Sequence, residues 1–320
     1  MRLFRSYLHL PETARGAVTV LGNFDGLHRG HLAVIGEGAS IARRLDAPLA
    51  VLTFEPHPRR VFRPDDPPFR LTPLRIKERQ CEAAGIDLLI IAHFDQTFLH
   101  RDAGNFVSEV LVSGLNVRHV VAGQAFRFGH HRTGDVALLT RLGQNYGFGV
   151  TGVGLMRDQD GNILSSTRIR QALQNGQPRE AALVLGRAWE IAGRVETGAR
   201  LGRTLGFPTA NLSLSDYLRP AYGVYAVRAG IDSGLTTLWR NGVANLGRRP
   251  TVDGQEERLE VHLFDVDEDL YGQHLRVQLI DYLRPEQRFD SLDALKAAIA
   301  ADAQAARRLF ATDGPVPPDV

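Results

Sequence analysis

The chain has 320 residues, of which 43% are hydrophobic and 23% are charged, a composition typical of a folded protein rather than a disordered one. This length exceeds what one hydrophobic core usually serves, so we expect two domains. Lysine and arginine number 38 against 36 for aspartate and glutamate, which argues against nucleic-acid or membrane-surface binding through overall charge.

The amino terminus and the cysteine content indicate a compartment. Residues 1–16 lack the continuous apolar core of a signal peptide, and no run approaches the ~20 apolar residues of a membrane span. The single cysteine, Cys81, excludes an internal disulfide framework, and it lies in a helical pattern where we expect it to pack. We therefore expect a cytoplasmic protein that binds neither nucleic acid nor membranes.

The first half of the chain alternates short apolar runs with helical patterns. The runs predict strands buried on both faces, at residues 17–22, 48–54, 87–94, 117–123 and 148–154. The helical patterns cover residues 30–45, 74–85, 105–115, 134–147, 166–176 and 178–186. This alternation predicts a Rossmann-like α/β domain, a parallel sheet covered by helices, over residues 1–186.

The apolar runs in the second half of the chain predict strands without intervening helices. They cover residues 189–196, 223–231, 236–246, 258–266 and 275–283. A helix then begins after Ser291, a candidate N-cap, and continues to residue 310. We expect an antiparallel β-barrel closed by a C-terminal helix over residues 187–312, followed by a disordered tail at 313–320.

The stretch "VLGNFDGLHRGH" predicts a phosphate site. A buried strand ends at Gly22 and a helix begins close to Gly30, and the carboxyl ends of parallel strands and helix amino termini both favour anionic ligands. The glycine spacing matches neither a dinucleotide-binding fold nor a P-loop. His28 and His31 fall on one side of the opening helical turn, where their N–H groups suit negative charge that develops on phosphoryl oxygens.

Two other interpretations of the histidines stay open. They could be unrelated surface residues, or they could bind a metal, although no cysteine or carboxylate at zinc-type spacing accompanies them. A second phosphate signal lies in "ILSSTRIRQAL", where Arg168 and Arg170 fall in the first turn of a predicted helix. A bound polyanion would offset this unfavourable placement, and solvated arginines after an ordinary serine N-cap are the alternative.

Four motifs carry a resemblance to a known family. "GNFDGLHRGH", "TFEPHP" at 53–58, "FRFGHHRTGD" at 126–135 and "LSSTRIR", in this order, resemble the FMN adenylyltransferase module of bacterial bifunctional riboflavin kinase/FAD synthetases. The resemblance implies that His28 and His31 hold the ATP phosphates while the phosphate of FMN attacks the α-phosphorus and pyrophosphate leaves. It also implies that Ser166 and Arg170 hold the leaving phosphates.

The same resemblance implies further contacts in this module. Residues implied at the ATP phosphates are Gly22, Asn23, Phe24, Asp25, Ser166, Thr167 and Arg170. Residues implied at the flavin are Pro56, His57, Pro58, Phe62, Phe126 and Phe128. One departure is visible: the family commonly has Asp or Asn where this sequence has Ala125, so a polar contact to the flavin is missing or is supplied elsewhere, for example by Gln124.

The glycine-rich stretch "GRVETGARLGRTLGFPTANL" predicts a second phosphate site. It is not a P-loop, because the glycine interval is one residue short and Arg203 stands in place of lysine. The backbone N–H groups near Gly193, Gly202 and Gly206 can still wrap phosphates. Thr209 and Asn211 alternate across one residue, so their side chains share one side of an extended segment, where they suit Mg²⁺ or, alternatively, solvent.

The second half resembles riboflavin kinase along almost its whole length. The resemblance lies in "GFPTANL", "GVYAV", "NGVANLGRRPTVDG", "LEVHLFDVDEDLYG" and "YLRPEQRFDSLDALKAAI". It implies a six-stranded barrel in which Thr209 and Asn211 bind Mg²⁺ and ATP phosphates. It also implies that Glu260 is the general base for the ribityl 5′-hydroxyl. Strand alternation alone does not show that Glu260 points into the barrel, because it shares a side with His262 and Phe264.

We therefore expect a bifunctional enzyme that uses ATP and Mg²⁺. One domain converts riboflavin to FMN and the other converts FMN to FAD. Two alternatives remain at this point. The Ala125 departure suits a riboflavin kinase with a weak or vestigial adenylyltransferase, and the basic stretch "GRAWEIAGRVETGARLGR" suits a non-catalytic flavin or nucleotide sensor that binds nucleic acid.

Overall fold

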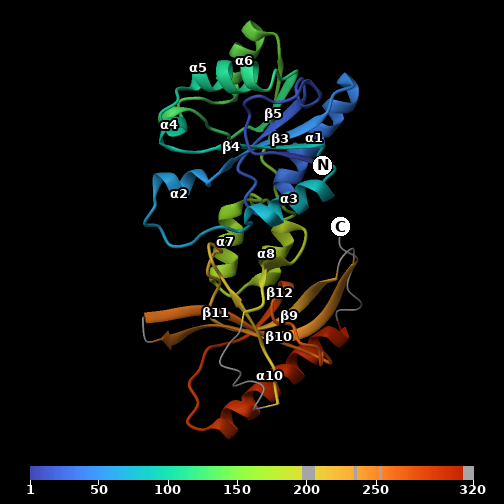
Figure 1. Cartoon of the computed structure of the whole chain (residues 1–320), viewed down its shortest axis with the longest axis vertical. Helices are drawn as coiled ribbons and strands as arrows, with labels where there is room; N and C mark the ends of the chain where they lie inside the picture. Colours follow the sequence, from blue (N-terminus) through green and yellow to red (C-terminus); the bar gives the residue numbers. More distant parts are fainter. Residues whose placement is uncertain (197–205, 234–235, 252–253, 313–320) are drawn as a thin grey trace. The chain divides into compact units, whose positions relative to one another are not determined.

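The computed structural model describes residues 1–196, 206–233, 236–251 and 254–312 (Figure 1). The predicted tail at 313–320 lies outside this range. The chain divides into two compact units: an N-terminal unit of Met1–Pro67 and Thr72–Ser166, and a C-terminal unit of Pro68–Leu71 together with the chain from Thr167 onward. By its contacts, segment 167–186 groups with the C-terminal unit, whereas the sequence assigns it to the N-terminal domain. The boundary between the catalytic domains near Gly186 stays a prediction.

The N-terminal unit contains a parallel sheet, as predicted, and this sheet has six strands in the order β1-β4-β3-β2-β5-β6. The strands are β1 (Arg2–Phe4), β2 (Val18–Leu21), β3 (Leu49–Glu55), β4 (Leu88–His93), β5 (His119–Gly123) and β6 (Gly149–Val153). Every ladder is parallel. Strand β1 is absent from the prediction, because three residues with a charged end carry too little apolar pattern to be recognised.

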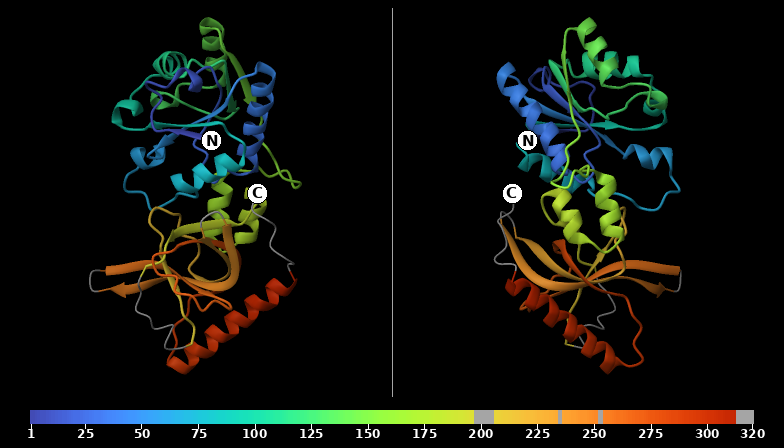
Figure 2. Two further views of the ribbon diagram at one scale, coloured as in Figure 1. Left: turned by 45° about the vertical axis from the view of Figure 1, so that its right-hand side comes forward. Right: turned by 180° about the vertical axis from the view of Figure 1, so that it is seen from behind.

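Helices and short turns connect these strands and cover both faces of the sheet (Figures 1 and 2). They are η1 (Glu12–Ala14), α1 (Arg29–Leu45), α2 (Pro58–Phe62), α3 (Leu74–Ala83), α4 (Gln96–Leu99), α5 (Ala103–Asn105), the π-helix η2 (Phe106–Gly114), η3 (His130–Arg132) and α6 (Val136–Tyr146). The single predicted helix at 105–115 is thus the end of a short α-helix followed by a π-helix.

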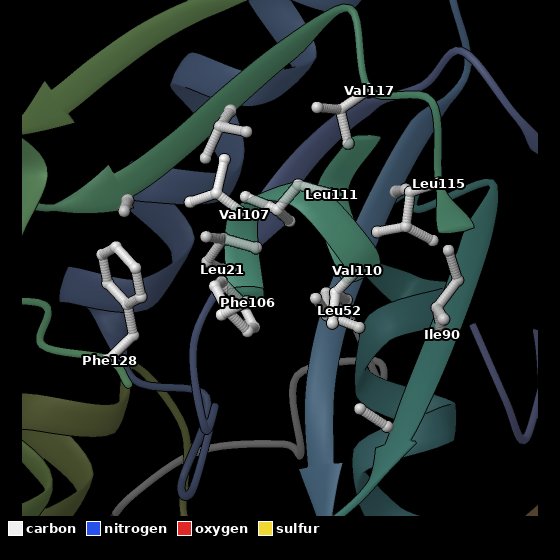
Figure 3. Close-up of a cluster of buried hydrophobic side chains, with 14 of the residues drawn as sticks. Leu21, Leu52, Ile90, Phe106, Val107, Val110, Leu111, Leu115, Val117 and Phe128 are labelled. Carbon is white, nitrogen blue, oxygen red and sulfur yellow. The ribbon is translucent and has the colours of Figure 1, made fainter. Parts of the chain in front are cut away.

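The two faces of the parallel sheet have separate hydrophobic cores. Figure 3 shows one of them, where Phe106, Val107 and Leu111 of η2 lie against Leu21 of β2 and Leu52 of β3. The other core packs α1 and α3 against alternate residues of the same strands. Cys81 is fully buried in this second core, and burial raises the pKa of its thiol to about 12. The thiol therefore stays protonated and serves packing, as the sequence predicts.

The C-terminal unit begins with α7 (Ser166–Gln174, of which Ser166 itself groups with the N-terminal unit) and α8 (Pro178–Leu185). An antiparallel sheet follows, with strand order β7-β12-β9-β10-β11-β8. Its strands are β7 (Trp189–Arg194), β8 (Ala210–Ser213), β9 (Gly223–Ser233), β10 (Thr236–Thr251), β11 (Gly254–Leu263) and β12 (His274–Pro285). The last helix is α10 (Leu292–Thr312).

This antiparallel sheet curls so that its two edge strands meet. The N–H of Glu196, just after β7, donates to the carbonyl of Asn211 in β8 at 2.9 Å. The inner face is apolar and buried, with Leu259 and Val261 at most 1% exposed. Helix α10 covers part of the outer face, where Phe310 packs with Val243 and Phe264 (Figure 2). The predicted six-stranded barrel with a C-terminal helix is confirmed.

Candidate active sites

The loop between β2 and α1, residues 22–28, is tightly turned. Phe24, Gly26 and Leu27 have φ values of +48°, +94° and +39°, all in the left-handed region. The Phe24 ring is 1% exposed and folds back under the loop, so that a Cβ at Gly22 would meet it at 2.9 Å. Position 22 therefore has no room for a side chain. Within the loop, Gly22 is half-buried and Asn23 is exposed, whereas residues 24–28 are buried. We call residues 22–28 the nucleotide loop.

His28 and His31 lie together at the start of α1. His28 is the N-cap of this helix, and its Nδ1 accepts a hydrogen bond from the His31 N–H at 3.3 Å. The two rings stack with centroids 3.7 Å apart and planes 20° apart. Because Nδ1 is an acceptor, the neutral His28 ring carries its proton on Nε2. The pair thus places an imidazole N–H donor at the positive end of a 17-residue helix dipole, a suitable place for an anion.

Hydrogen bonds of one side chain within the nucleotide loop and two outside it hold the loop in place. The carboxylate of Asp25, which is 3% exposed, accepts from the Thr72 N–H at 2.9 Å. The Oγ1 of Thr72 in turn accepts a hydrogen bond from the Gly26 N–H at 2.8 Å, so Thr72 binds the loop at two residues. The Ser166 hydroxyl donates to the Asp25 carbonyl at 2.7 Å. Ser166 is therefore adjacent to the loop, where its donor supports the backbone of a predicted phosphate-binding residue.

Thr167 and Arg170 belong to the C-terminal unit. Thr167 is exposed. The Nε of Arg170 donates to the Phe69 carbonyl at 2.9 Å, and its guanidinium lies 5.7 Å from the centre of the Phe69 ring. Arg170 thus contacts segment Pro68–Leu71 of the same unit. The predicted contact of Arg170 with phosphate stays a prediction.

A pocket of about 270 Å³ in the N-terminal unit contains most of the predicted flavin residues. Its wall includes Pro58, Phe62, Phe126 and Phe128, together with Asn23 of the nucleotide loop. Ala125, the departure noted in the sequence, also lines it. The sequence did not single out the other lining residues, which are Phe54, Phe94, Phe98, Leu99, Arg101, Phe106, Arg127, Gly129 and Arg132. The pocket therefore combines phenylalanine rings with the guanidinium groups of Arg101, Arg127 and Arg132. This combination suits a planar aromatic ligand that carries an anionic group.

Two predicted flavin residues and one predicted substitute lie outside this lining. Pro56 is exposed, and His57 is buried as the N-cap of α2, with Nδ1 accepting from the Arg59 N–H at 3.1 Å. Gln124 does not compensate for Ala125, because its amide oxygen lies over Gly152 of β6, 2.3 Å from where a Cβ would be. Ala125 itself lines the pocket. The polar contact expected at position 125 is therefore not supplied by Gln124.

A second site lies in the C-terminal unit, on the face of the sheet that α10 covers. A pocket of about 240 Å³ there contains Thr209, Asn245 and Glu260, and Asp302 of α10 is part of its wall. Glu260 lies directly opposite Asn211 in β8 and Asn245 in β10, so these three side chains share one face. Because the inner face belongs to Leu259 and Val261, Glu260 points out of the barrel and toward the pocket under α10.

Thr209 also lines a separate pocket of about 280 Å³. The wall of this pocket includes Pro208, Val261 and Leu263, and the segment from Val266 to Tyr271. Thr209 is therefore where two cavities of the C-terminal unit adjoin, one of which contains Glu260. A donor and an acceptor substrate in the two cavities would meet at this residue.

The glycines predicted at the second phosphate site are only partly described. Gly193 is in β7, opposite Leu275 of β12. Gly206 has φ of +86° and open space around its Cα, which leaves room for a close approach of a ligand to the backbone. Gly202 lies outside the described residues.

The donor set near Thr209 fits Mg²⁺ chemically. Thr209 and Asn211 supply neutral oxygens, Glu260 supplies a carboxylate across the ladder, and Mg²⁺ prefers oxygen ligands and completes its shell with water and phosphate. Among the described residues, no group of three or more His, Cys, Asp or Glu side chains is arranged to hold a metal, and His28 and His31 therefore belong to no such group. In the same described part of the chain, no helix has the length and apolar character needed to span a bilayer.

Comparisons with known proteins agree with this division. Residues 10–168 match the family model described as FAD synthetase, and residues 185–310 match that described as riboflavin kinase. The bifunctional riboflavin kinase/FMN adenylyltransferase of Escherichia coli (strain K12) is 44% identical over 316 residues, which cover 98% of this chain and 100% of the relative. The protein of the same name from Bacillus subtilis (strain 168) is 37% identical, with 94% and 95% covered.

A solved structure is similar over the same length. The crystal structure of a Streptococcus pneumoniae chain described as a macrolide-efflux protein has a TM-score of 0.83 and 32% sequence identity, and the match covers 96% of this chain and 98% of that one. Two family models in tandem and relatives of one name over nearly the full length establish the assignment. The chain belongs to the family of bifunctional riboflavin kinase/FMN adenylyltransferases.

Proposed function

We propose which residues of each unit perform the two reactions of this family. The C-terminal unit phosphorylates riboflavin with ATP to FMN, and the N-terminal unit transfers the adenylyl group of a second ATP to FMN, which yields FAD and pyrophosphate. The observation that supports this division best is the separation of the two candidate sites. The stacked histidines and the aromatic pocket belong to one unit, and Thr209, Asn211 and Glu260 belong to the other.

In the adenylyl site, the work of the protein is electrostatic. The phosphate of FMN is already an anion, so attack on the α-phosphorus needs no strong base, and the barrier lies in gathering negative charge. The His28 and His31 rings and the N–H groups of the nucleotide loop offer donors where this charge develops. Ser166, Thr167 and Arg170 are the proposed contacts of the leaving pyrophosphate.

In the kinase site, the chemistry requires a base. The ribityl 5′-hydroxyl must lose its proton as it attacks the γ-phosphorus of ATP, and the Glu260 carboxylate is the proposed acceptor. Thr209 and Asn211 would hold Mg²⁺, which neutralises phosphate charge when bound. Thr209 lines both cavities, and this supports riboflavin in the pocket with Glu260 and ATP in the adjoining one.

The flavin pocket of the N-terminal unit lacks the polar side chain that the family commonly has at position 125. We expect Ala125→Asn to lower the KM for FMN in FAD formation several-fold, because the new amide would line the pocket. The kinetic comparison uses Ala125→Val as a control of similar size without the amide. An equal effect of both variants would show that the amide is not involved.

Two variants test the division of labour. With riboflavin, ATP and Mg²⁺, His28→Ala should accumulate FMN because only the adenylyl step is impaired, whereas Asn211→Ala should form little FMN from riboflavin yet still convert added FMN to FAD. Products are separated by chromatography and followed by flavin fluorescence. Loss of the same step in both variants would refute the assignment.

We also place the reactions in the cytoplasm, since ATP is their substrate and the only cysteine is a free thiol.

A further inference from the structure

Lys77 of α3 is fully buried below the nucleotide loop, although no motif marks it. Lys77 is 0% exposed, and lysine is rarely buried without a specific reason. The printed sequence contains only two lysines, against 36 arginines. A buried lysine in a chain with so few lysines indicates that the compact ammonium group itself is needed at this position.

The ammonium of Lys77 joins two segments of the proposed adenylyl site. Its Nζ donates to the Asn23 carbonyl in the nucleotide loop at 2.9 Å. It also donates to Thr53 Oγ1 at 3.2 Å and to Glu55 Oε1 at 3.3 Å, both near the end of β3. β3 leads directly into Pro56, where the predicted flavin segment begins. One ammonium thus connects the loop predicted to bind ATP with the strand that precedes the flavin segment.

The hydrogen bonds around Asn23 have a fixed direction. Lysine can only donate, so Thr53 Oγ1 accepts from Lys77 and uses its own proton to donate to the Asn23 carbonyl at 3.2 Å. The Asn23 carbonyl therefore receives two hydrogen bonds, one of them from a cation. In a trans peptide the N–H points away from the carbonyl of the same peptide group, so the N–H of Phe24 points away from the buried ammonium.

We propose that Lys77 is a positioning residue of the adenylyl reaction. By binding the Asn23 carbonyl, it orients the Asn23–Phe24 peptide so that the Phe24 N–H donates to a phosphate of ATP. The cation also polarises this peptide, which strengthens the N–H as a donor. Lys77 touches no substrate in this scheme, because it acts through the peptide. The proposal rests on the proposed adenylyl function of the nucleotide loop.

The test compares variants by steady-state kinetics of both reactions in the full-length protein. For Lys77→Met, we expect kcat/KM for ATP in FAD formation to fall about 10- to 100-fold, somewhat less than the loss of a direct oxyanion donor. The KM for FMN should change little. Riboflavin phosphorylation by the same molecules should stay within twofold, because its proposed residues belong to the C-terminal unit, and the unchanged KM for FMN reports that the N-terminal unit is folded. Lys296→Met, at the exposed lysine of α10, is the matched control and should leave both reactions unchanged.

Further variants separate positioning from charge and from folding. Thr53→Val keeps the shape of a fully buried residue but removes one of the two hydrogen bonds to Asn23, so we expect a smaller loss than for Lys77→Met, whereas Thr53→Ser should retain activity. Lys77→Arg should not restore the rate, because the planar guanidinium cannot direct three N–H groups from one atom toward these three acceptors. If Lys77→Met fails to fold, the Thr53 pair decides the question.

The outcomes distinguish this proposal from the function on which it rests. Full activity of Lys77→Met or Thr53→Val in FAD formation, with His28→Ala inactive, would overturn the proposed role of Lys77 and leave the proposed adenylyl site in place. Full rescue by Lys77→Arg would also overturn it, since charge without geometry would then suffice. Full activity of His28→Ala would instead refute the adenylyl site itself.

Discussion

Gly30 allows stability and catalysis to be separated in a single substitution. It is the second residue of α1, and a Cβ at this position would lie 3.0 Å from Cε1 and Nδ1 of His28 and 3.3 Å from the Leu164 carbonyl. Cβ contacts are seldom this short, so in Gly30→Ala the His28 ring must move by a few tenths of an ångström or more. A misplacement of about 1 Å at a reacting centre can reduce the rate about 100-fold.

We therefore expect Gly30→Ala to reduce the rate of FAD formation from FMN and ATP by roughly 10- to 100-fold. The free energy of unfolding should change by less than about 1 kcal/mol, because alanine favours the helix by up to that amount and the tight contact opposes it. FAD formation is measured by chromatography and stability by thermal denaturation. Riboflavin phosphorylation by the same protein should be unaffected.

Gly36 provides the matched control on the same helix. A Cβ there meets nothing within 4 Å, so Gly36→Ala should stabilise α1 without moving His28. We expect a higher melting temperature and an unchanged rate of FAD formation. A wild-type rate in Gly30→Ala, or an equal loss in Gly36→Ala, would refute the argument that His28 must occupy its observed position.

Three further predictions concern other side chains. Glu260→Gln should slow FMN formation by about 10²- to 10⁴-fold, the usual range for loss of a general base, while added FMN still gives FAD; a fast variant would exclude Glu260 as the base. Burial, aided by the charge of Arg44, lowers the pKa of His119 from 6.5, so its contribution to stability is present above pH 6.5 and is lost as the pH falls below that value. Thermal denaturation between pH 7 and 5 should therefore show a flatter decline in His119→Gln, and an identical decline would contradict this. Arg284→Met should lower the free energy of unfolding by about 2–4 kcal/mol, because Asp302, which is 8% exposed, loses hydrogen bonds of 2.9 and 2.8 Å. The same variant should raise the KM for riboflavin, because both residues line the pocket that contains Glu260; unchanged stability and KM would rule out this role.

The sequence predicted those parts of the fold that depend on local periodicity. Continuous apolar runs such as 48–54 and 87–94 can only be buried on both faces, so the parallel sheet followed from them. The pairing of His28 with His31 followed from helical spacing, and the structure stacks the two rings. Strand β1 was missed because three residues are too few to show a period.

The remainder of the site depends on contacts between distant segments. Lys77 lies in an ordinary amphipathic helix, and its acceptors are 22 to 54 residues away in the chain. Phe94 and Phe98 contribute to the proposed flavin pocket from segments without a motif. Phe94 follows β4 directly, and an aromatic residue directly after a buried strand is a signal that could have been used. Glu260 shows the limit of strand alternation, which separates two faces but does not tell which face borders a ligand.

The two sites differ in how their residues are attached to the backbone. In the N-terminal unit, the nucleotide loop follows β2 and lies outside the ladder, so changes of length there leave the sheet intact. In the C-terminal unit, Asn211, Asn245 and Glu260 are opposed across three paired strands. A single inserted residue in β11 would turn Glu260 to the apolar interior and bring Leu259 or Val261 to the pocket. A change of spacing within a strand therefore exchanges the faces of the proposed kinase site, whereas a change of length in the nucleotide loop leaves the ladders of the parallel sheet paired.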